Sequence, residues 1–233
     1  MSHPPPLSTF RTGLTAVVIG ATGGIGAALA DALERSPAAA AVHRLSRRGG
    51  VDLTDEASLA AAAARIGAAD IVICAAGLLH DDAVSPEKTW ASFDPDAAAR
   101  AFAVNAIGPA LAAKHFLPIL PKGRKTAFAA LSARVGSISD NRLGGWMSYR
   151  ASKAALNQFI RTLGVELARK NPQALIVGLH PGTVDTALSQ PFQRGARLFT
   201  PADAAAHLLG VLDGLTPEDS GGCFAWDGAR IPD

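Results

Sequence analysis

Short apolar runs alternate with helical patterns along most of the chain. Runs of strand length lie at residues 15–19, 42–45, 51–53, 71–74, 126–131, 175–179 and 223–226. Between them, apolar residues at helical spacing predict helices over residues 24–35, 55–66, 96–120 and 148–170, and Thr200-Pro201 is typical of a helix start. Such strands pair in parallel through right-handed crossovers. The pattern therefore predicts an α/β fold: a doubly wound, mostly parallel seven-stranded sheet (Rossmann fold) with helices on both faces.

The same pattern favours one domain over residues 14–233, because no linker or repeat interrupts it. Residues 1–13 contain a proline triplet and are expected to form a flexible N-terminal tail. In doubly wound sheets, ligands bind beyond the carboxyl ends of the strands. The loops that begin at residues 20, 45, 75, 132 and 180 are therefore expected to converge.

Composition removes several classes of function. The formal net charge is only +2, and no long run of Lys or Arg indicates a nucleic-acid partner. No apolar run approaches the ~20 residues of a membrane span. The two cysteines form no CxxC motif and the six histidines are scattered, so neither a disulfide framework nor a metal site is expected. A soluble cytoplasmic protein fits these features.

A glycine-rich turn, Gly20-Ala-Thr-Gly-Gly-Ile-Gly26, joins the first predicted strand to the first predicted helix. Glycines there let the backbone approach a pyrophosphate, and the helix N-terminus attracts negative charge. A dinucleotide is the natural ligand, although such turns also occur in purely structural loops. The spacing can be read as GxxxGxG or as GxxGxxG, and the short chain favours the first, more compact type.

Ser46, Arg47 and Arg48 follow the second predicted strand, where an NAD enzyme would place an acidic residue on the ribose. Two arginines at that position favour a 2′-phosphate, hence NADP(H) over NAD(H). Two solvated arginines in an ordinary loop are the alternative. Asp52 and Leu53, a few residues further on, are expected to flank the adenine.

Tyr149 and Lys153 are four residues apart on a predicted helix and therefore share one face. A free tyrosine titrates near ~10, and a neighbouring cation would lower the pKa of Tyr149 enough for general acid/base work. Such a pair alone is weak evidence, because a lysine often packs over a core aromatic. Here it follows, in order, the glycine turn and the loop Ala75-Ala76-Gly77.

Together, the segments GATGGIG, CAAG, AVNAIGP, YRASK and LHPGTVDT resemble the short-chain dehydrogenase/reductases over nearly the whole chain. More narrowly, LSARVGSISDNRLGGW before YRASKAALN resembles the C-factor/sniffer-like carbonyl reductase branch. The resemblance implies an oxidoreductase that uses NADP(H) on a small-molecule carbonyl/alcohol pair. It also implies a homodimer or homotetramer through the long helices.

The resemblance further implies roles for matched residues. Tyr149 would protonate the carbonyl oxygen during reduction, Lys153 would lower its pKa and hold the nicotinamide ribose, and Asn105 would link Lys153 to water. The family's substrate-orienting serine falls on Ala133, so Ser132 or Ser137 would have to replace it, and we favour Ser132. The residues expected to contact the cofactor are Gly20, Thr22, Gly23, Gly24, Ile25, Gly26, Ser46, Arg47, Arg48, Asp52, Leu53, Ala75, Ala76, Gly77, Asn105, Tyr149, Lys153, Pro181, Gly182, Val184 and Thr186.

Residues 183–200 show few regular signals and are expected to form a mobile substrate lid. Two other functions stay open at this stage. The missing serine permits a cofactor-binding regulatory or signalling protein of C-factor type with vestigial catalysis. An epimerase or dehydratase that oxidises its substrate transiently is the other alternative.

Overall fold

The computed structural model describes residues 7–82, 84–193 and 198–233, and within them a central sheet has six strands. All neighbouring strands run parallel. The second strand lies on one side of the first and the third on the other, which creates the switch point where doubly wound sheets bind ligands. The order across the sheet is β2 (Ala39–Leu45), β1 (Leu14–Ile19), β3 (Ile71–Cys74), β4 (Thr126–Leu131), β5 (Ala174–His180) and β8 (Cys223–Ala225).

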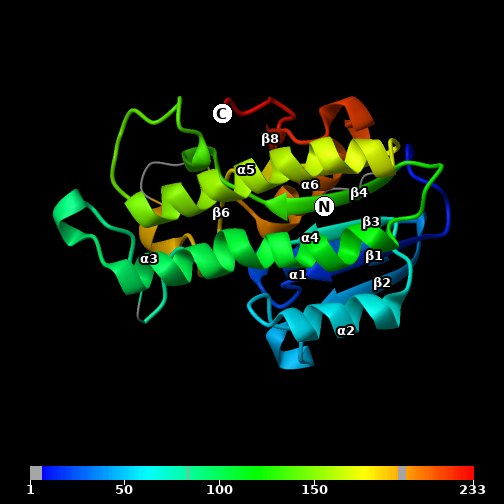
Figure 1. Ribbon diagram of the computed structural model, residues 1–233, viewed down its shortest axis with the longest axis horizontal. Coiled ribbons are helices and arrows are strands. Elements are labelled where there is room, and N and C mark those ends of the chain that lie inside the picture. The colour runs from blue at the N-terminus through cyan, green and yellow to red at the C-terminus, as the bar shows by residue number, and fades with distance from the viewer. Residues whose placement is uncertain (1–6, 83, 194–197) are drawn as a thin grey trace.

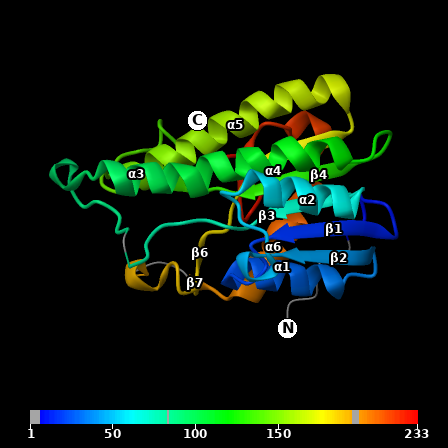
Figure 2. The same cartoon turned by 60° about the horizontal axis from the view of Figure 1, so that its bottom comes forward.

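Helices cover both faces of this sheet (Figures 1 and 2). One face packs against α1 (Gly24–Glu34) and α6 (Pro201–Gly214), and the other against α2 (Glu56–Ile66), α4 (Gly108–Phe116) and α5 (Met147–Lys170). These contacts form two separate apolar cores, one on each side of the strands. β3 and β4 are buried along their whole length, as expected for central strands of a parallel sheet.

Local sequence explains where several helices begin. The Asp55 carboxylate accepts hydrogen bonds from the first turn of α2, and Thr200 caps α6 in the same way. Asp94 caps α3 (Pro95–Phe102), which continues through a wider π-helical turn (Ala103–Ile107) into α4. Single-turn helices lie at Arg47–Gly49, Trp90–Ser92, Leu117–Ile119, Arg134–Gly136, Gln190–Phe192 and Pro217–Asp219.

The doubly wound α/β fold is confirmed, but the predicted seven-stranded sheet is wrong in its strand count. Residues 51–53 form no strand, because the Ser58 hydroxyl bonds both the N–H and the carbonyl of Asp52, the groups that a strand would use for pairing. An additional two-stranded sheet, β6 (Thr183–Val184) with β7 (Leu198–Phe199), lies apart from the main one.

The expected N-terminal tail is also wrong for residues 7–13. Leu7 is fully buried and Phe10 nearly so, both within the core that contains α1 and α6. The backbone N–H groups of Ser8 and Thr9 donate to the Asp213 carboxylate at 3.0 and 2.9 Å. Apolar side chains at positions 7 and 10 thus fix this segment to α6. Residues 1–6 of the predicted tail lie outside the described residues.

None of the described helices has the length and apolar character needed to cross a membrane.

Candidate functional site

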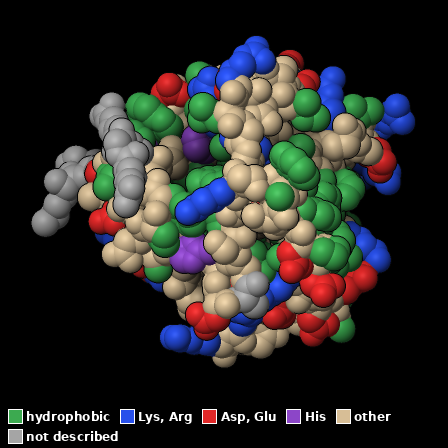
Figure 3. All heavy atoms as spheres, turned by 90° about the vertical axis from the view of Figure 1, so that its left-hand side faces the viewer, with side chains coloured by type: hydrophobic (Ala, Val, Ile, Leu, Met, Phe, Trp, Pro, Cys, Tyr) green, Lys and Arg blue, Asp and Glu red, His purple; other side chains and the backbone are tan. Residues whose placement is uncertain are grey.

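The predicted site residues gather at the carboxyl ends of the central strands. In Figure 1 the strand arrows point to the end of the molecule where the N-terminal half of α5 lies. Figure 3 looks at this end, where histidine and basic side chains lie among hydrophobic ones.

The glycine turn after β1 has the shape that a bound phosphate chain needs. Gly20 has φ +87°, and a Cβ there would lie 2.8 Å from the Ala76 nitrogen. A Cβ on Gly26 would lie only 2.2 Å from the Gly20 oxygen, so this position excludes any side chain. Gly23 precedes α1 without a side-chain cap, which leaves the first N–H groups of the helix available to an anion. A pyrophosphate therefore fits this turn.

The basic pair after β2 lies beside that turn. The Leu45 carbonyl at the end of β2 accepts hydrogen bonds from the N–H groups of Gly20 and Ala21. Arg47 and Arg48 follow in an exposed single-turn helix that Ser46 caps. Positive charge therefore lies next to the glycine turn, at the place where an NAD enzyme would carry an acidic residue.

The two residues expected at the adenine have partners within the protein. The Asp52 carboxylate accepts hydrogen bonds from the N–H and the hydroxyl of Thr54, both at 2.8 Å, and these bonds lower its pKa. Leu53 is buried, and it leaves no room for a Cβ on Gly108. Asp52 thus braces the start of α2, and Leu53 packs against the start of α4.

Lys153 is almost completely buried on the inner face of α5. Its ammonium group donates to the Leu131 carbonyl at the end of β4, at 2.8 Å. Burial lowers the pKa of Lys153 to about 8. A Cβ on Gly77 would lie 3.7 Å from the Lys153 Nζ atom, so the ammonium group adjoins the loop after β3.

Tyr149 lies one turn earlier on α5, with its ring centroid 5.8 Å from the Lys153 Nζ atom. Burial raises the pKa of Tyr149 to about 12. The net shift is therefore upward, opposite to the expected lowering, because the effect of burial dominates. The physical reason is that the ammonium group is turned toward the Leu131 carbonyl, while the phenol loses its hydration.

Asn105 is fully buried in the π-helical turn between α3 and α4. Its amide oxygen accepts from the Leu78 N–H, and its amide nitrogen donates to the Leu78 carbonyl, both at 2.7 Å. The same nitrogen lies 3.1 Å from the Ser152 hydroxyl. Asn105 therefore fixes the loop after β3 against α5, beside Gly77, and makes no direct bond to Lys153.

Neither candidate serine points its hydroxyl at Tyr149. The Ser132 hydroxyl donates to the Asn157 side chain at 2.6 Å, one turn beyond Lys153 on α5. The Ser137 hydroxyl bonds the Asp140 N–H and the Asp233 carbonyl. The preference for Ser132 as the substrate-orienting hydroxyl is therefore not supported by this arrangement, because Asn157 holds that group.

The segment after β5 covers the glycine turn. Pro181 and Val184 are buried, and a Cβ on Gly24 would lie 2.6 Å from the Thr186 side chain. Gly182, with φ +74°, is held close to the rings of Phe199 and Trp226. The predicted lid thus contains the short β6–β7 sheet and a single-turn helix; its residues 194–197 lie outside the described residues.

Aromatic rings connect this lid to Tyr149. Phe192 meets His80 edge-on at a centroid distance of 5.5 Å and Trp146 at 5.1 Å. Trp146 in turn meets the Tyr149 ring edge-on at 6.1 Å. The lid, the loop after β3 and the start of α5 therefore contact each other beside the phenol.

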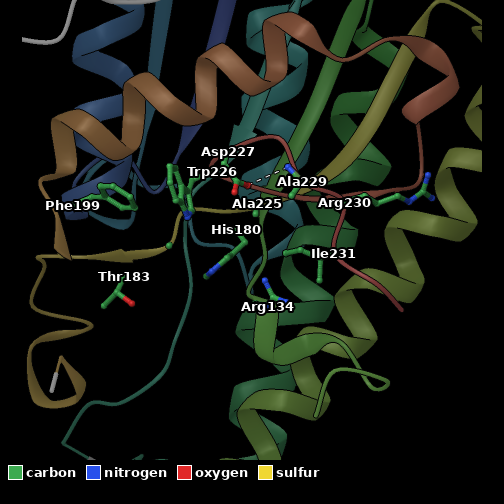
Figure 4. Close-up of a pocket in the computed structure, with 11 residues that line it drawn as sticks. Arg134, His180, Thr183, Phe199, Ala225, Trp226, Asp227, Ala229, Arg230 and Ile231 are labelled. Carbon is green, nitrogen blue, oxygen red and sulfur yellow. Dashed lines mark hydrogen bonds between the residues drawn. The ribbon is translucent and has the colours of Figure 1, made fainter. Parts of the chain in front are cut away.

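A pocket of about 320 Å³ lies at the ends of β4, β5 and β8 (Figure 4). Phe199 and Trp226 form an aromatic wall, and His180 and Arg134 line the opposite part. Burial and the nearby Arg134 lower the pKa of His180 to about 4, so this ring is neutral at physiological pH. The pocket therefore combines an aromatic wall with charged and polar side chains, which also include Asp227 and Arg230.

Sequence reasoning missed three residues of this region: Glu87, Trp146 and His180. Glu87 is buried and bonds the first turn of α5, although it lies in a loop 61 residues earlier. One signal was present: the segment before α5, Gly144-Gly145-Trp146, contains no side chain that can cap a helix. For His180 the sequence offered only its place before Pro181-Gly182.

Comparisons with known proteins agree with this geometry. Residues 14–196 match the family described as short chain dehydrogenase. The 1-hydroxy-2-glutathionyl-2-methyl-3-butene dehydrogenase of Rhodococcus sp. (strain AD45) is 37% identical over 74% of each chain. The C-signal protein of Myxococcus xanthus is 39% identical over 58% of this chain and 77% of its own. NADPH-bound carbonyl reductase from chicken fatty liver superposes with a TM-score of 0.82 at 25% identity, covering 96% of this chain and 95% of its own.

Proposed function

This chain belongs to the short-chain dehydrogenase family of NAD(P)-dependent oxidoreductases, and on that premise we propose that it reduces an aldehyde or ketone with NADPH, with Tyr149 as proton donor. One observation carries the proposal. The glycine turn touches the loop after β3 at Ala76, and the next residue, Gly77, adjoins both Asn105 and the Lys153 ammonium group. A continuous surface thus joins a phosphate-binding turn to a phenol–ammonium pair.

The residues on this surface fit NADP(H). The turn Gly20–Gly26 and the N-terminus of α1 would hold the pyrophosphate, and Arg47 with Arg48 would hold the 2′-phosphate. Pro181, Gly182, Val184 and Thr186 would border the nicotinamide end. The NADPH-bound chicken enzyme supports this choice of cofactor.

The 2′-phosphate assignment has a direct test. Replacing Arg47 and Arg48 together by alanine is expected to weaken NADPH binding at least tenfold and to leave NADH binding within about twofold, because only NADPH carries the phosphate. Isothermal titration with both cofactors measures this. Arg65→Ala, an exposed arginine at the end of α2, is the matched control. An unchanged NADPH/NADH ratio in the double variant would refute the assignment.

The proposed chemistry needs a proton at one hydroxyl oxygen. When bound, NADPH supplies the hydride that reduces the carbonyl carbon. The Tyr149 hydroxyl, protonated at neutral pH, donates its proton to the carbonyl oxygen as negative charge develops there. Lys153, mostly protonated below pH 8, then stabilises the resulting phenolate and binds hydroxyl groups of the cofactor.

We further propose that Tyr149 donates this proton without a serine partner. Ala133 has no hydroxyl, and Asn157 holds the hydroxyl of Ser132. Ser132→Ala is therefore expected to keep turnover within about fivefold of the wild type. A loss of a hundredfold or more, of the size seen when a donor to a developing oxyanion is removed, would show that Ser132 rotates toward the substrate.

NADPH consumption tests the proposal as a whole. NADPH absorbance is followed with a panel of aldehydes, ketones and quinones. The reverse reaction is tested with NADP⁺ and a set of alcohols. This set includes a glutathione conjugate, because the name of the Rhodococcus relative gives such a conjugate as its substrate. Turnover by the wild type and its loss in Tyr149→Phe, with NADPH binding retained, is the expected result. Equal turnover in both proteins would exclude Tyr149 as the acid.

A second candidate is an NADP(H)-binding signalling protein with vestigial catalysis. The similarity to the C-signal protein and the alanine at position 133 favour it. This candidate predicts NADPH binding without turnover of any compound in the panel. A single carbonyl turned over by the wild type and not by Tyr149→Phe decides against it.

A further inference from the structure

Glu87 is a buried carboxylate that the proposed reaction does not use. It is 6% exposed and lies beside Tyr149, Ser148 and the apolar side chains of Leu79 and Val84. Among the described residues, no Lys, Arg or His lies within ion-pair distance of it. A buried carboxylate without a cation must be compensated by hydrogen bonds or by a dipole.

The start of α5 provides that compensation. The Ser148 N–H donates to the two carboxylate oxygens of Glu87 at 3.3 and 3.2 Å, and the Ser148 hydroxyl donates to one of them. Helix N-termini carry unpaired N–H groups and a positive partial charge. The residue before α5, Trp146, offers no side-chain cap. Glu87 thus caps this helix from another part of the chain.

The main chain of Glu87 also contacts the start of α5. Its carbonyl accepts a hydrogen bond from the Trp146 N–H at 2.6 Å. Trp146 has φ +53° and ψ +41°, a left-handed conformation that residues other than glycine rarely adopt. Such a conformation persists only where its surroundings hold it. Glu87 therefore supports both the backbone that precedes Tyr149 and the indole ring that touches it.

Tyr149 is the third residue of α5 and so belongs to the turn that frays first when a helix loses its cap. A proton donor that moves by about 1 Å can lose a hundredfold in rate. We infer that Glu87 is a positioning residue that holds the first turn of α5, and with it the Tyr149 phenol, in the reactive arrangement. This inference rests on the proposed function for its kinetic consequence.

The kinetic test compares Glu87→Ala and Glu87→Gln with Glu166→Gln, an exposed control on the same helix. Because the glycine turn is untouched, NADPH affinity is expected to stay within about twofold in all three. The kcat for a turned-over carbonyl is expected to fall tenfold or more in Glu87→Ala and less in Glu87→Gln, which keeps one acceptor oxygen. An unchanged kcat in a folded Glu87→Ala protein would overturn the inference.

A spectroscopic test needs no turnover, so it separates failure of this inference from failure of the proposed function. Tyr149 is the only tyrosine of the chain, and its ionisation can be followed by tyrosinate absorbance. Fraying exposes the phenol. In Glu87→Ala the pKa of Tyr149 should therefore be near ~10, the value of a free tyrosine, and well below its pKa in the wild type. Identical titrations would overturn the inference. If Glu87→Ala does not fold, Glu87→Gln and Ser148→Ala are titrated instead.

Discussion

Replacing Lys153 by methionine is expected to abolish turnover and yet to stabilise the folded protein at neutral pH. The ammonium group is buried, and its pKa falls from 10.5 to about 8. Between these values the unfolded chain binds more protons than the folded one, so wild-type stability rises with pH in this interval. Below pH 8 the burial of the charge costs about 3 kcal/mol.

Methionine removes that cost but leaves the Leu131 carbonyl without the hydrogen bond it accepts from Lys153 at 2.8 Å. The lost bond costs about 1–2 kcal/mol. Lys153→Met should therefore be more stable than the wild type by about 1–2 kcal/mol at pH 7. The advantage should shrink by about 2 kcal/mol between pH 7 and pH 10, as the wild-type lysine loses its proton when folded.

Urea unfolding at both pH values, followed by tryptophan fluorescence, measures the free energy of unfolding. Lys170→Met, at the exposed end of the same helix, is the matched control and should show no such pH dependence. A Lys153→Met protein that is less stable at pH 7, or whose difference from the wild type does not change with pH, would refute the assigned burial cost.

Three further outcomes are expected. Gly26→Ala should abolish NADPH binding, measured by fluorescence, because the added Cβ would lie 2.2 Å from the Gly20 oxygen. The same clash should lower the free energy of unfolding by about 1–3 kcal/mol. Retained binding would contradict the geometry of the turn. Asn105→Ala should lower the free energy of unfolding, measured with urea, by about 2–4 kcal/mol, because it leaves the buried N–H and carbonyl of Leu78 without their partner. A decrease of less than about 1 kcal/mol would show that Asn105 is dispensable there. NADPH affinity should fall as the pH rises through about 8 and Lys153 loses its proton, whereas a flat profile from pH 7 to 9 would exclude that contact.

Local signals predicted the parts of the site that depend on local backbone. The glycine turn is an example, because Gly20 and Gly26 contact each other within seven residues of chain and exclude side chains whatever the rest of the fold does. Helical spacing likewise placed Tyr149 and Lys153 on one face. Thr200 signalled the start of α6 by the same kind of short-range hydrogen bond.

Long-range burial could not be predicted in this way. The spacing of Tyr149 and Lys153 says nothing of how deeply each is buried, and burial is what raises one pKa and lowers the other. Glu87 meets α5 only after 61 residues of intervening chain, so no periodic pattern marks it. Residues 51–53 have a strand-like composition, yet Ser58 takes both backbone groups of Asp52.

The proton donor itself can be observed most directly through its ionisation with and without NADP⁺. The lone tyrosine of the free protein should form no tyrosinate until the pH approaches about 12. Bound NADP⁺ brings the positive nicotinamide ring to the phenol if Tyr149 lies where we propose, and this cation should move tyrosinate formation to clearly lower pH. The same titration curve with and without NADP⁺, in a protein shown to be saturated with it, would contradict the placement of Tyr149 at the reaction centre.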